Sequence, residues 1–248
     1  MEIEAKRMAN WLIMSSLIGG LLTGKAMAQS SSDTYPMADS VTVYQPPVAY
    51  PDERADGWRE RIGSASLNEV AGLFTTLFWL SPELAQSIPC LPPLGDWSGN
   101  RISSGFGWRN HPTLRTIRHH DGIDIAGPHQ YVRTAATGIV TAVGWSASLG
   151  KYVQVDHLNS YETLYGHLAM VLVRPGQPVR IGETLGITGR TGRATGVHLH
   201  YSVLKQGLPV NPTPYLTLAI EFVHTYQRQL NRTAHYQQPI TASPTWQK

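Results

Sequence analysis

The sequence predicts a mainly β domain preceded by a short helical segment. Of its 248 residues, 42% are hydrophobic, which is enough for a core, and only 15% are charged. The chain also has 23 glycines and 17 prolines, which are typical of short strands joined by tight turns. This composition argues against a coiled coil, an acidic solvating chain or an all-helical bundle. The length allows one catalytic-sized domain plus a smaller segment.

The first 28 residues have the pattern of a secretory signal peptide. Lys6 and Arg7 precede an apolar run over 11–22, and Ala26-Met-Ala28 follows. A basic start, a run of about a dozen apolar residues and an A-x-A site predict cleavage after Ala28, and therefore export to the periplasm, the cell wall or the medium. The alternatives are a buried N-terminal helix and an uncleaved anchor, for which the run is short. After cleavage we expect no membrane span, because no apolar run in the sequence reaches the roughly 20 residues that a span needs.

The remaining chain divides into four parts. Residues 29–63, rich in Ser, Asp, Pro and Tyr, predict an extended linker. A small helical segment is expected over 64–100, where Ser66 and Glu69 form a capping box that opens an apolar helix from about 67 to 80. Short β segments between glycines then predict the main domain. Its bounds are 101–216, its strands are expected at 132–143, 152–156, 163–167, 179–187 and 197–204, and a C-terminal helix and polar tail are expected over 217–248.

Charge is distributed unevenly between these parts. Residues 29–100 contain nine acidic and three basic residues, a net of −6, whereas 101–216 contain eleven basic and five acidic residues, a net of +6. A basic surface attracts anionic polymers, and in an exported protein these are cell-wall polymers or membrane surfaces rather than nucleic acid, whose binding motifs we do not find. The alternative is an ordinary solvated surface. The opposed charges also suggest a hypothesis in which 29–100 folds over a groove as a latency segment; the alternative is a spacer.

Eight of the ten histidines fall between residues 111 and 200, and the first cluster contains His119, His120 and Asp124. In a strand, positions 120, 122 and 124 share a face, and Gly122 leaves space between the outer two. His119 would then point to the other face, so His120 is the preferred partner of Asp124. An imidazole nitrogen and a carboxylate oxygen aimed together suit a divalent ion of the zinc type. The single cysteine, Cys90, rules out a cysteine zinc cluster.

A second motif places His198 and His200 on one strand face, with apolar residues alternating on the other. A third segment holds His167, which shares a predicted strand face with Thr163 and Tyr165. His120, Asp124 and His200 together supply two nitrogens and one oxygen, and three protein ligands with an open fourth position are typical of a catalytic zinc. His167 and His198 are then left for the second sphere, where water activation needs a base and an oxyanion needs a donor.

These motifs occur together in an ordered set, which resembles the lysostaphin/LytM-type zinc metallopeptidases, peptidase family M23, over about 103–215. The resemblance implies a small, mostly antiparallel β-sheet or barrel-sandwich domain with an open groove. It implies one Zn²⁺ per chain held by His120, Asp124 and His200, and it implies that His167 and His198 are the catalytic histidines. The matching segments are Ser104-Gly-Phe-Gly-Trp-Arg-Asn-His-Pro112, His120-Asp-Gly-Ile-Asp124, Thr163-Leu-Tyr-Gly-His-Leu168, Gly176–Gly186 and Gly196-Val-His-Leu-His200.

The resemblance implies an exported zinc endopeptidase that hydrolyses peptide cross-links or stem peptides of bacterial peptidoglycan. One alternative is a non-hydrolytic cell-wall binder or amidase activator on the same fold, against which the complete ligand set argues. Another is a biotinyl- or lipoyl-like carrier, for which Lys151 and Lys205 are badly placed. A regulatory envelope protein as partner is left open. Arg109 either orients substrate or closes a structural hydrogen bond. Ser202 stands where the family more often has Glu, a change expected to affect packing more than metal chemistry.

Overall fold

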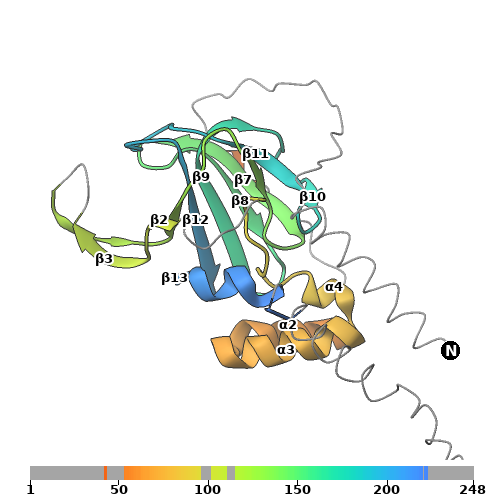
Figure 1. Cartoon of the computed structure of the whole chain (residues 1–248). Coiled ribbons are helices and arrows are strands. Elements are labelled where there is room, and N and C mark those ends of the chain that lie inside the picture. The colour runs from red at the N-terminus through yellow and green to blue at the C-terminus, as the bar shows by residue number, and fades with distance from the viewer. Residues whose placement is uncertain (1–41, 44–52, 96–101, 111–114, 220, 223–248) are drawn as a thin grey trace, which may run out of the picture.

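The computed structural model describes residues 42–43, 53–95, 102–110, 115–219 and 221–222, and this part of the chain is mainly β (Figure 1). Eleven of the described strands form one antiparallel sheet with the central order β1-β7-β8-β9-β12-β5-β2, and two further strands form the β3–β4 hairpin. The predicted fold class is confirmed. The elements are β1 (Thr42–Val43), α2 (Glu53–Ser64), α3 (Leu67–Leu80), α4 (Pro82–Ala85), β2 (Ile102–Ser104), β3 (Gly107–Asn110), β4 (Ile117–His120), β5 (Ile123–Ala126), β6 (Tyr131–Arg133), β7 (Gly138–Ser146), β8 (Gly150–Asp156), β9 (Tyr161–Val171), β10 (Pro178–Val179), β11 (Thr184–Thr188), β12 (His198–Lys205), β13 (Leu208–Val210) and the 3₁₀ helix η1 (Thr213–Thr217).

Helix α3 begins and ends where the capping box and Ser81-Pro82 predict. The Ser66 backbone N–H donates to the Glu69 carboxylate at 2.7 Å, and the Glu69 N–H donates back to the Ser66 hydroxyl at 3.5 Å. Helix α2, by contrast, occupies residues that composition assigned to an extended linker. Ile62 is fully buried and Trp58 packs against the same core, so burial of one helix face outweighs the weak local signal.

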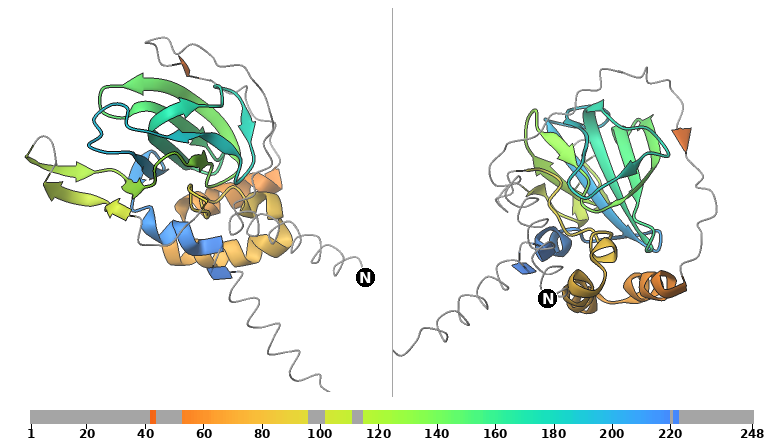
Figure 2. Two further views of the ribbon diagram at one scale, coloured as in Figure 1. Left: turned by 45° about the horizontal axis from the view of Figure 1, so that its top comes forward. Right: turned by 90° about the vertical axis from the view of Figure 1, so that its right-hand side faces the viewer.

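The helices dock against one end of the sheet and share its core (Figures 1 and 2). The Lys205 ammonium donates to the Ala65 carbonyl, and the Asn159 side-chain amide donates to the Ser87 carbonyl at 2.9 Å. Among the described residues, none from 53–95 lines the groove described below. The described part of the acidic segment therefore packs beneath the sheet and does not cover that groove.

Two of the predicted strands are each split by a turn. The segment 132–143 forms β6 and β7 with a turn between them, and 179–187 forms β10 and β11 around Gly182, whose φ of 81° favours glycine. Helical backbone continues after η1 at 218–219 and 221–222. The rest of the predicted C-terminal helix and tail, and the predicted signal peptide, lie outside the described residues. Searching the described helices for one long and apolar enough to cross a membrane finds none.

Candidate metal centre and catalytic groove

Sheet pairing brings two distant motifs side by side. Strand β12 lies between β9 and β5, and His200 is the direct cross-strand partner of Asp124. His120 ends β4, the returning strand of the hairpin, and after Asp121 and Gly122 the chain enters β5. A Cβ at Gly122 would lie 2.5 Å from the Tyr201 carbonyl oxygen and 3.0 Å from the His200 ring, so this close approach requires glycine.

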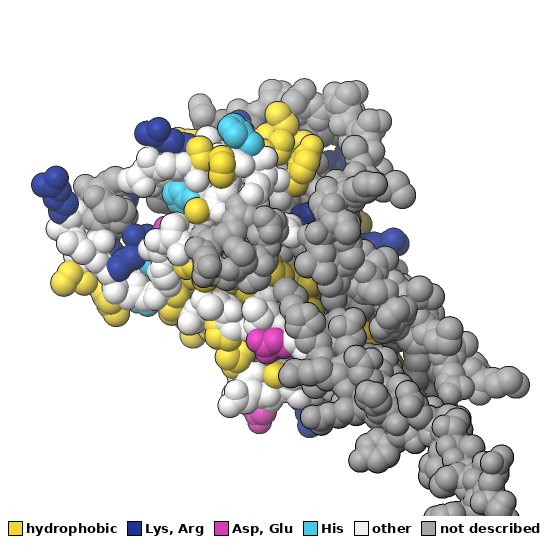
Figure 3. Space-filling view, in the orientation of Figure 1, with side chains coloured by type: hydrophobic (Ala, Val, Ile, Leu, Met, Phe, Trp, Pro, Cys, Tyr) yellow, Lys and Arg dark blue, Asp and Glu magenta, His cyan; other side chains and the backbone are white. Residues whose placement is uncertain are grey.

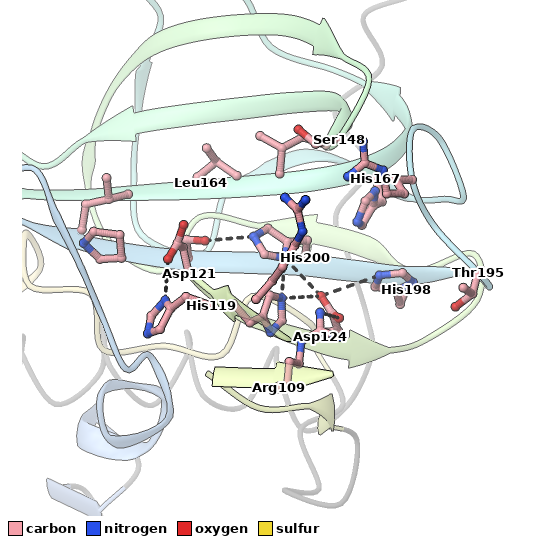
Figure 4. A pocket seen from close by; sticks show the side chains of 17 residues that line it. Arg109, His119, Asp121, Asp124, Ser148, Leu164, His167, Thr195, His198 and His200 are labelled. Carbon is pink, nitrogen blue, oxygen red and sulfur yellow. Dashed lines mark hydrogen bonds and ion pairs between the residues drawn. The ribbon is translucent and has the colours of Figure 1, made fainter. Parts of the chain in front are cut away.

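Three ligand-type atoms meet at this point. His120 Nε2 lies 3.2 Å from Asp124 Oδ1, His200 Nδ1 lies 3.1 Å from the same oxygen, and the two nitrogens lie 3.1 Å apart. Dashed lines in Figure 4 follow the contacts of Asp124 with His198 and His200. The atoms of His120, Asp124 and His200 thus form a nearly equilateral triangle, and among the described residues these three form a group that could hold a metal ion.

Hydrogen bonds on the far side of each ring fix which nitrogen faces the triangle. His120 Nδ1 donates to the Gly105 carbonyl at 2.7 Å, which leaves Nε2 with a free lone pair in the neutral ring. His200 Nε2 lies 3.0 Å from the Ser202 hydroxyl, which leaves Nδ1 toward Asp124. Outer hydrogen bonds of this kind accompany metal-binding histidines and set their tautomers.

The triangle fits a tetrahedral metal ion with nitrogen and oxygen ligands. In such a site, bonds of about 2.0–2.2 Å hold the ligand atoms about 3.3 Å or slightly more apart, within a few tenths of an ångström of the spacing here. Three lone pairs facing one another at 3.1–3.2 Å repel unless a cation or a proton lies between them. The donor set therefore suits a divalent cation of the zinc type, with a fourth side open to the groove.

Two more histidines stand beside this triangle. His198 Nδ1 donates to the Gly196 carbonyl at 2.9 Å, and His167 Nδ1 donates to the Thr191 carbonyl at 2.8 Å. Their ring centroids are 4.6 Å apart, and His198 Nε2 lies 3.7 Å from Asp124 Oδ1. Each neutral ring therefore keeps Nε2 free to take up a proton. The structure thus gathers all five predicted site residues around one point.

His167 reaches the groove through a β-bulge that alternation alone does not predict. Strand alternation puts it on the face of Thr163 and Tyr165, yet both of these are buried in the core. The pairing of β9 with β8 shifts register between Tyr165 and Leu168, and His167 adopts a φ of 60°. Gly166 and His167 together lie opposite one residue of β8, so strict alternation is interrupted at His167 and the predicted face was wrong.

Burial and neighbouring charges set the protonation of these groups. Burial lowers the pKa of His167 to about 4, against the opposing effect of its bond to the Thr191 carbonyl. Burial likewise lowers the pKa of His200. Burial raises the pKa of the Asp124 carboxyl, but in the metal-free centre hydrogen bonds from His120 and His200 rings that carry a proton toward it outweigh burial and hold that pKa well below its usual range. Burial therefore favours the uncharged form of His167 and His200, while the Asp124 carboxyl stays ionised.

Other candidates from the sequence have other partners. His119 pairs with exposed Asp121 at 2.7 Å and does not join the triangle. Arg109 Nη2 lies 3.4 Å from Asp124 Oδ2, the carboxylate oxygen that faces away from the triangle, so the structure places it beside the centre. Cys90 is a buried free thiol.

Sequence reasoning missed Thr191, which holds His167 in place. The Thr191 hydroxyl donates to the Leu168 carbonyl at 2.8 Å and accepts from the Lys151 N–H at 3.0 Å, while its own carbonyl receives the His167 ring. Nothing in the local sequence marks this loop residue. For Ser202 the sequence did contain an indication, because strand alternation puts it on the same face as His198 and His200. Its contact with the His200 ring was not predicted.

The centre lies in a groove of about 410 Å³. Hairpin β3–β4 forms one wall, and the loop after β11 forms another (Figure 4). The floor comes from β9 and β12, through side chains such as Leu164 and Ser202. A groove open to solvent and walled by two loops can admit an extended peptide.

Comparison with known proteins identifies this domain. The sequence model "Peptidase family M23" matches residues 118–212. The DD-carboxypeptidase/endopeptidase Mpg of Neisseria meningitidis serogroup B is 46% identical over 136 residues, which cover 52% of this chain and 31% of that protein. The peptidoglycan DD-endopeptidase ShyA of Vibrio cholerae is 42% identical over 113 residues, which cover 45% of this chain and 26% of that protein.

Solved structures also resemble part of this chain. The catalytic domain of the prophage-encoded M23 protein EnpA from Enterococcus faecalis is 31% identical, covering 45% of this chain and 88% of that one, with a TM-score of 0.40. The curated relatives are longer proteins, and this chain spans less than a third of Mpg and of ShyA. Residues 118–212 of this chain therefore match peptidase family M23.

Proposed function

We propose that this chain is an exported zinc-dependent endopeptidase that hydrolyses peptide cross-links or stem peptides of bacterial peptidoglycan. The observation that carries the proposal is the triangle of His120 Nε2, Asp124 Oδ1 and His200 Nδ1, with two further imidazoles beside its open side. The names of the relatives support the substrate, because Mpg is named a DD-carboxypeptidase/endopeptidase and ShyA a peptidoglycan DD-endopeptidase.

One zinc ion per chain would be held by these three atoms. Bound zinc supplies a Lewis acid that activates water and polarises a carbonyl near neutral pH. Asp124 contributes the negative charge of the site, and Arg109 compensates its outer oxygen at 3.4 Å. The bonds of the two ring ligands to Gly105 and Ser202 keep both rings aimed at the ion.

His167 and His198 handle protons at Nε2. Because each Nδ1–H is fixed on a backbone carbonyl, a neutral ring has an unprotonated Nε2 that accepts the proton released by the attacking water. Once Nε2 has taken up that proton, the ring can donate it to the departing amine or donate a hydrogen bond to the developing oxyanion. Burial lowers the pKa of His167 to about 4, so the ring is neutral near neutral pH and its Nε2 is unprotonated.

Export follows from the predicted signal peptide over 1–28, and it suits a substrate that lies outside the cytoplasm. The expected mature chain begins at Gln29. Intact mass measurement of the protein recovered from the envelope fraction of an expressing cell tests this, and a chain that retains residues 1–28 in the cytoplasm contradicts it.

The function is tested with isolated cell walls of defined cross-link chemistry. Purified chain with one equivalent of zinc should release new amino termini, identified by mass spectrometry, and chelator should abolish the release.

His120→Ala should lose both zinc and activity. His167→Ala and His198→Ala should keep zinc and lose about 10²–10⁴-fold in rate, the usual worth of general acid–base catalysis. His129→Asn, an exposed position with a φ of 52° that Asn tolerates, is the matched control. Zinc binding without any cleavage overturns the enzyme proposal.

A further inference from the structure

The hairpin that forms one wall of the groove is weakly stabilised by its own residues. Strands β3 and β4 pair with each other and form a sheet separate from the eleven-stranded one. Of their eight residues only His120 is buried, while Trp108 and Ile117 are 76% and 75% exposed. Arg109 and Arg118 are direct cross-strand partners, and like charges in such positions destabilise two paired strands. Even without that cost, an isolated two-stranded hairpin is only marginally stable in water.

The polar contacts between this hairpin and the sheet end on two residues of the metal centre. His120 Nε2, at the end of β4, lies 3.2 Å from Asp124 Oδ1 and 3.1 Å from His200 Nδ1. Arg109 Nη2, in β3, lies 3.4 Å from Asp124 Oδ2 (Figure 4). Among the described residues, no other hydrogen bond or ion pair joins β3 or β4 to a strand of the sheet. The position of the groove wall therefore depends on the residues of the centre.

The rest of the hairpin projects away from the sheet. In Figure 1 the ribbon of β3 extends away from the central strands, and Figure 3, in the same orientation, shows hydrophobic and basic side chains exposed along it. Phe106, which precedes β3, is partly buried against the core, and its ring centroid lies 4.9 Å from that of His119. Apolar packing thus holds the base of the hairpin, whereas the wall beside the centre is held through His120 and Arg109.

We infer that the metal ion of the proposed centre also holds the hairpin against the sheet, with Arg109 as a positioning residue that provides a second attachment. This rests on the metal centre of the proposed function and adds formation of the groove wall to its role. When both rings are neutral, His120 Nε2, Asp124 Oδ1 and His200 Nδ1 direct lone pairs at one another and repel. A cation bound by one ligand from the hairpin and two from the sheet removes this repulsion and joins the two, so metal binding is coupled to local folding.

Hydrogen exchange followed by mass spectrometry tests this on the full chain near neutral pH, with and without zinc. Without zinc, the backbone amides of 107–110 and 117–120 should exchange at least about tenfold faster than those of β7 and β8, because the hairpin opens while the sheet stays folded. Free zinc at about 100 times its Kd should slow exchange in the hairpin by about 100-fold, since zinc binds only the closed form. Equal protection of the hairpin with and without zinc overturns the inference.

Variants separate the two attachments, and protection of β7 and β8 shows in each that the sheet is intact. His200→Ala removes a ligand on the sheet and leaves the hairpin sequence unchanged, so its hairpin should exchange as fast with zinc as without. Arg109→Gln should speed hairpin exchange in the zinc-loaded chain by about tenfold, the usual worth of a hydrogen bond between charged groups. Arg109→Lys, which keeps a positive charge beside Asp124, should restore most of the protection.

Arg118→Gln is the matched control for Arg109→Gln. Arg118 lies directly across the hairpin, and its side chain contacts the Thr116 hydroxyl at 3.3 Å and no acidic residue among those described. This variant should not speed exchange. A hairpin that stays protected by zinc in His200→Ala, or that opens equally in Arg109→Gln and Arg118→Gln, overturns the inference.

Assays on isolated cell walls separate this inference from the proposed function. Cleavage by the zinc-loaded chain, with a hairpin equally protected in both states, would overturn the inference and leave the endopeptidase standing. Zinc-dependent protection without cleavage would support the inference and overturn the endopeptidase. A chain that binds no zinc overturns both.

Discussion

At the scale of single residues, the groove is organised by what lies behind each imidazole. His120, His167 and His198 all donate Nδ1–H to a backbone carbonyl and present Nε2. His200 is reversed, with Nε2 on the Ser202 hydroxyl and Nδ1 toward Asp124. The reversal follows from position, because His200 lies in mid-strand directly opposite Asp124 and is close enough to present its near nitrogen. Three backbone carbonyls and the Ser202 hydroxyl therefore determine which ring nitrogen of each histidine faces the groove.

Ser202→Ala should weaken metal binding without removing a ligand. The change leaves the buried His200 Nε2–H without its partner and frees the ring to rotate, and loss of such an outer contact costs about 10–100-fold in metal affinity. A competition titration with a chromophoric zinc chelator measures it. Ser148→Ala is the matched control and should leave affinity unchanged, because the Ser148 hydroxyl lies in the groove wall and, among the described residues, bonds to the Ser146 hydroxyl and not to a histidine of the centre. Equal affinity in both variants would mean that Ser202 does not orient the ring.

His157 should make folding stability depend on pH. It is fully buried, with Nδ1 donating to the Thr137 carbonyl and Nε2 2.8 Å from Thr163 Oγ1, and burial lowers its pKa to about 4. The unfolded chain, with an ordinary pKa near 6.5, binds the extra proton first. Stability is therefore fully present above pH 6.5 and is lost as pH falls toward 4, by at most about 1.4 kcal/mol per pH unit from this group.

Urea unfolding of the zinc-free chain between pH 4 and 7.5 checks this slope. His167 and His200 contribute in the same direction, since their pKa values are also lowered. The contribution of His157 is the difference between wild type and His157→Gln, which keeps a polar side chain but does not titrate. Parallel pH profiles for the two proteins would show that His157 is not the source.

At the scale of elements, alternation predicted one strand of the site well and another badly. In β12, His198, His200 and Ser202 share the groove face while Leu199 and Tyr201 are buried, as period two requires. In β9 the same rule fails at His167, because the bulge shifts register where no sequence signal marks it. His120 and Asp124 met as expected, yet they lie on separate strands, β4 and β5, joined by a bend at Asp121 and Gly122. Non-local pairings of this kind cannot be read from spacing alone.

The loops behind His167 depend on two interlocked glycines. A Cβ on Gly150 would lie 2.2 Å from Thr191 Oγ1, and one on Gly192 would lie 2.2 Å from the Gly150 nitrogen. Both glycines have positive φ, 63° and 70°. The backbone of one loop thus sits against that of the other, and this contact keeps the Thr191 carbonyl in reach of His167.

Gly150→Ala should displace Thr191 and disturb His167 more than the metal triangle. We expect hydrolysis to fall by about tenfold or more, because small displacements of a catalytic group are costly, while bound zinc stays near one per chain. Gly207→Ala is the matched control, since Gly207 has a φ of 74° but open space around its Cβ position. It reports the cost of backbone strain alone. Equal losses in both variants would attribute the effect to strain rather than to the Thr191 contact.

At the scale of the whole molecule, the helical segment and the sheet form one folding unit. Leu77 and Ile88 are fully buried in the cluster that also contains Ile125 and Leu199 of the sheet. Asn159 and Lys205 tie the helices to the β8–β9 turn and to the end of β12. The sequence predicted helix α3 but not that it packs against one end of the sheet. An apolar pattern indicates that a helix face is buried, but it does not indicate which element buries it.

This arrangement predicts that the helices act on stability and not on access to the groove. Leu77→Ala should lower the free energy of unfolding by about 2–5 kcal/mol, the usual cost of truncating a buried leucine, while Thr76→Ala, on the exposed face, should cost far less. Thermal unfolding followed by circular dichroism should remain a single transition in both. Below the transition, initial rates on isolated cell walls should equal the wild-type rate, because the groove lies on other elements. A higher initial rate in Leu77→Ala than in the wild type would instead support the latency hypothesis for 29–100. A segment that blocks the groove should allow faster turnover when its packing against the sheet is weakened.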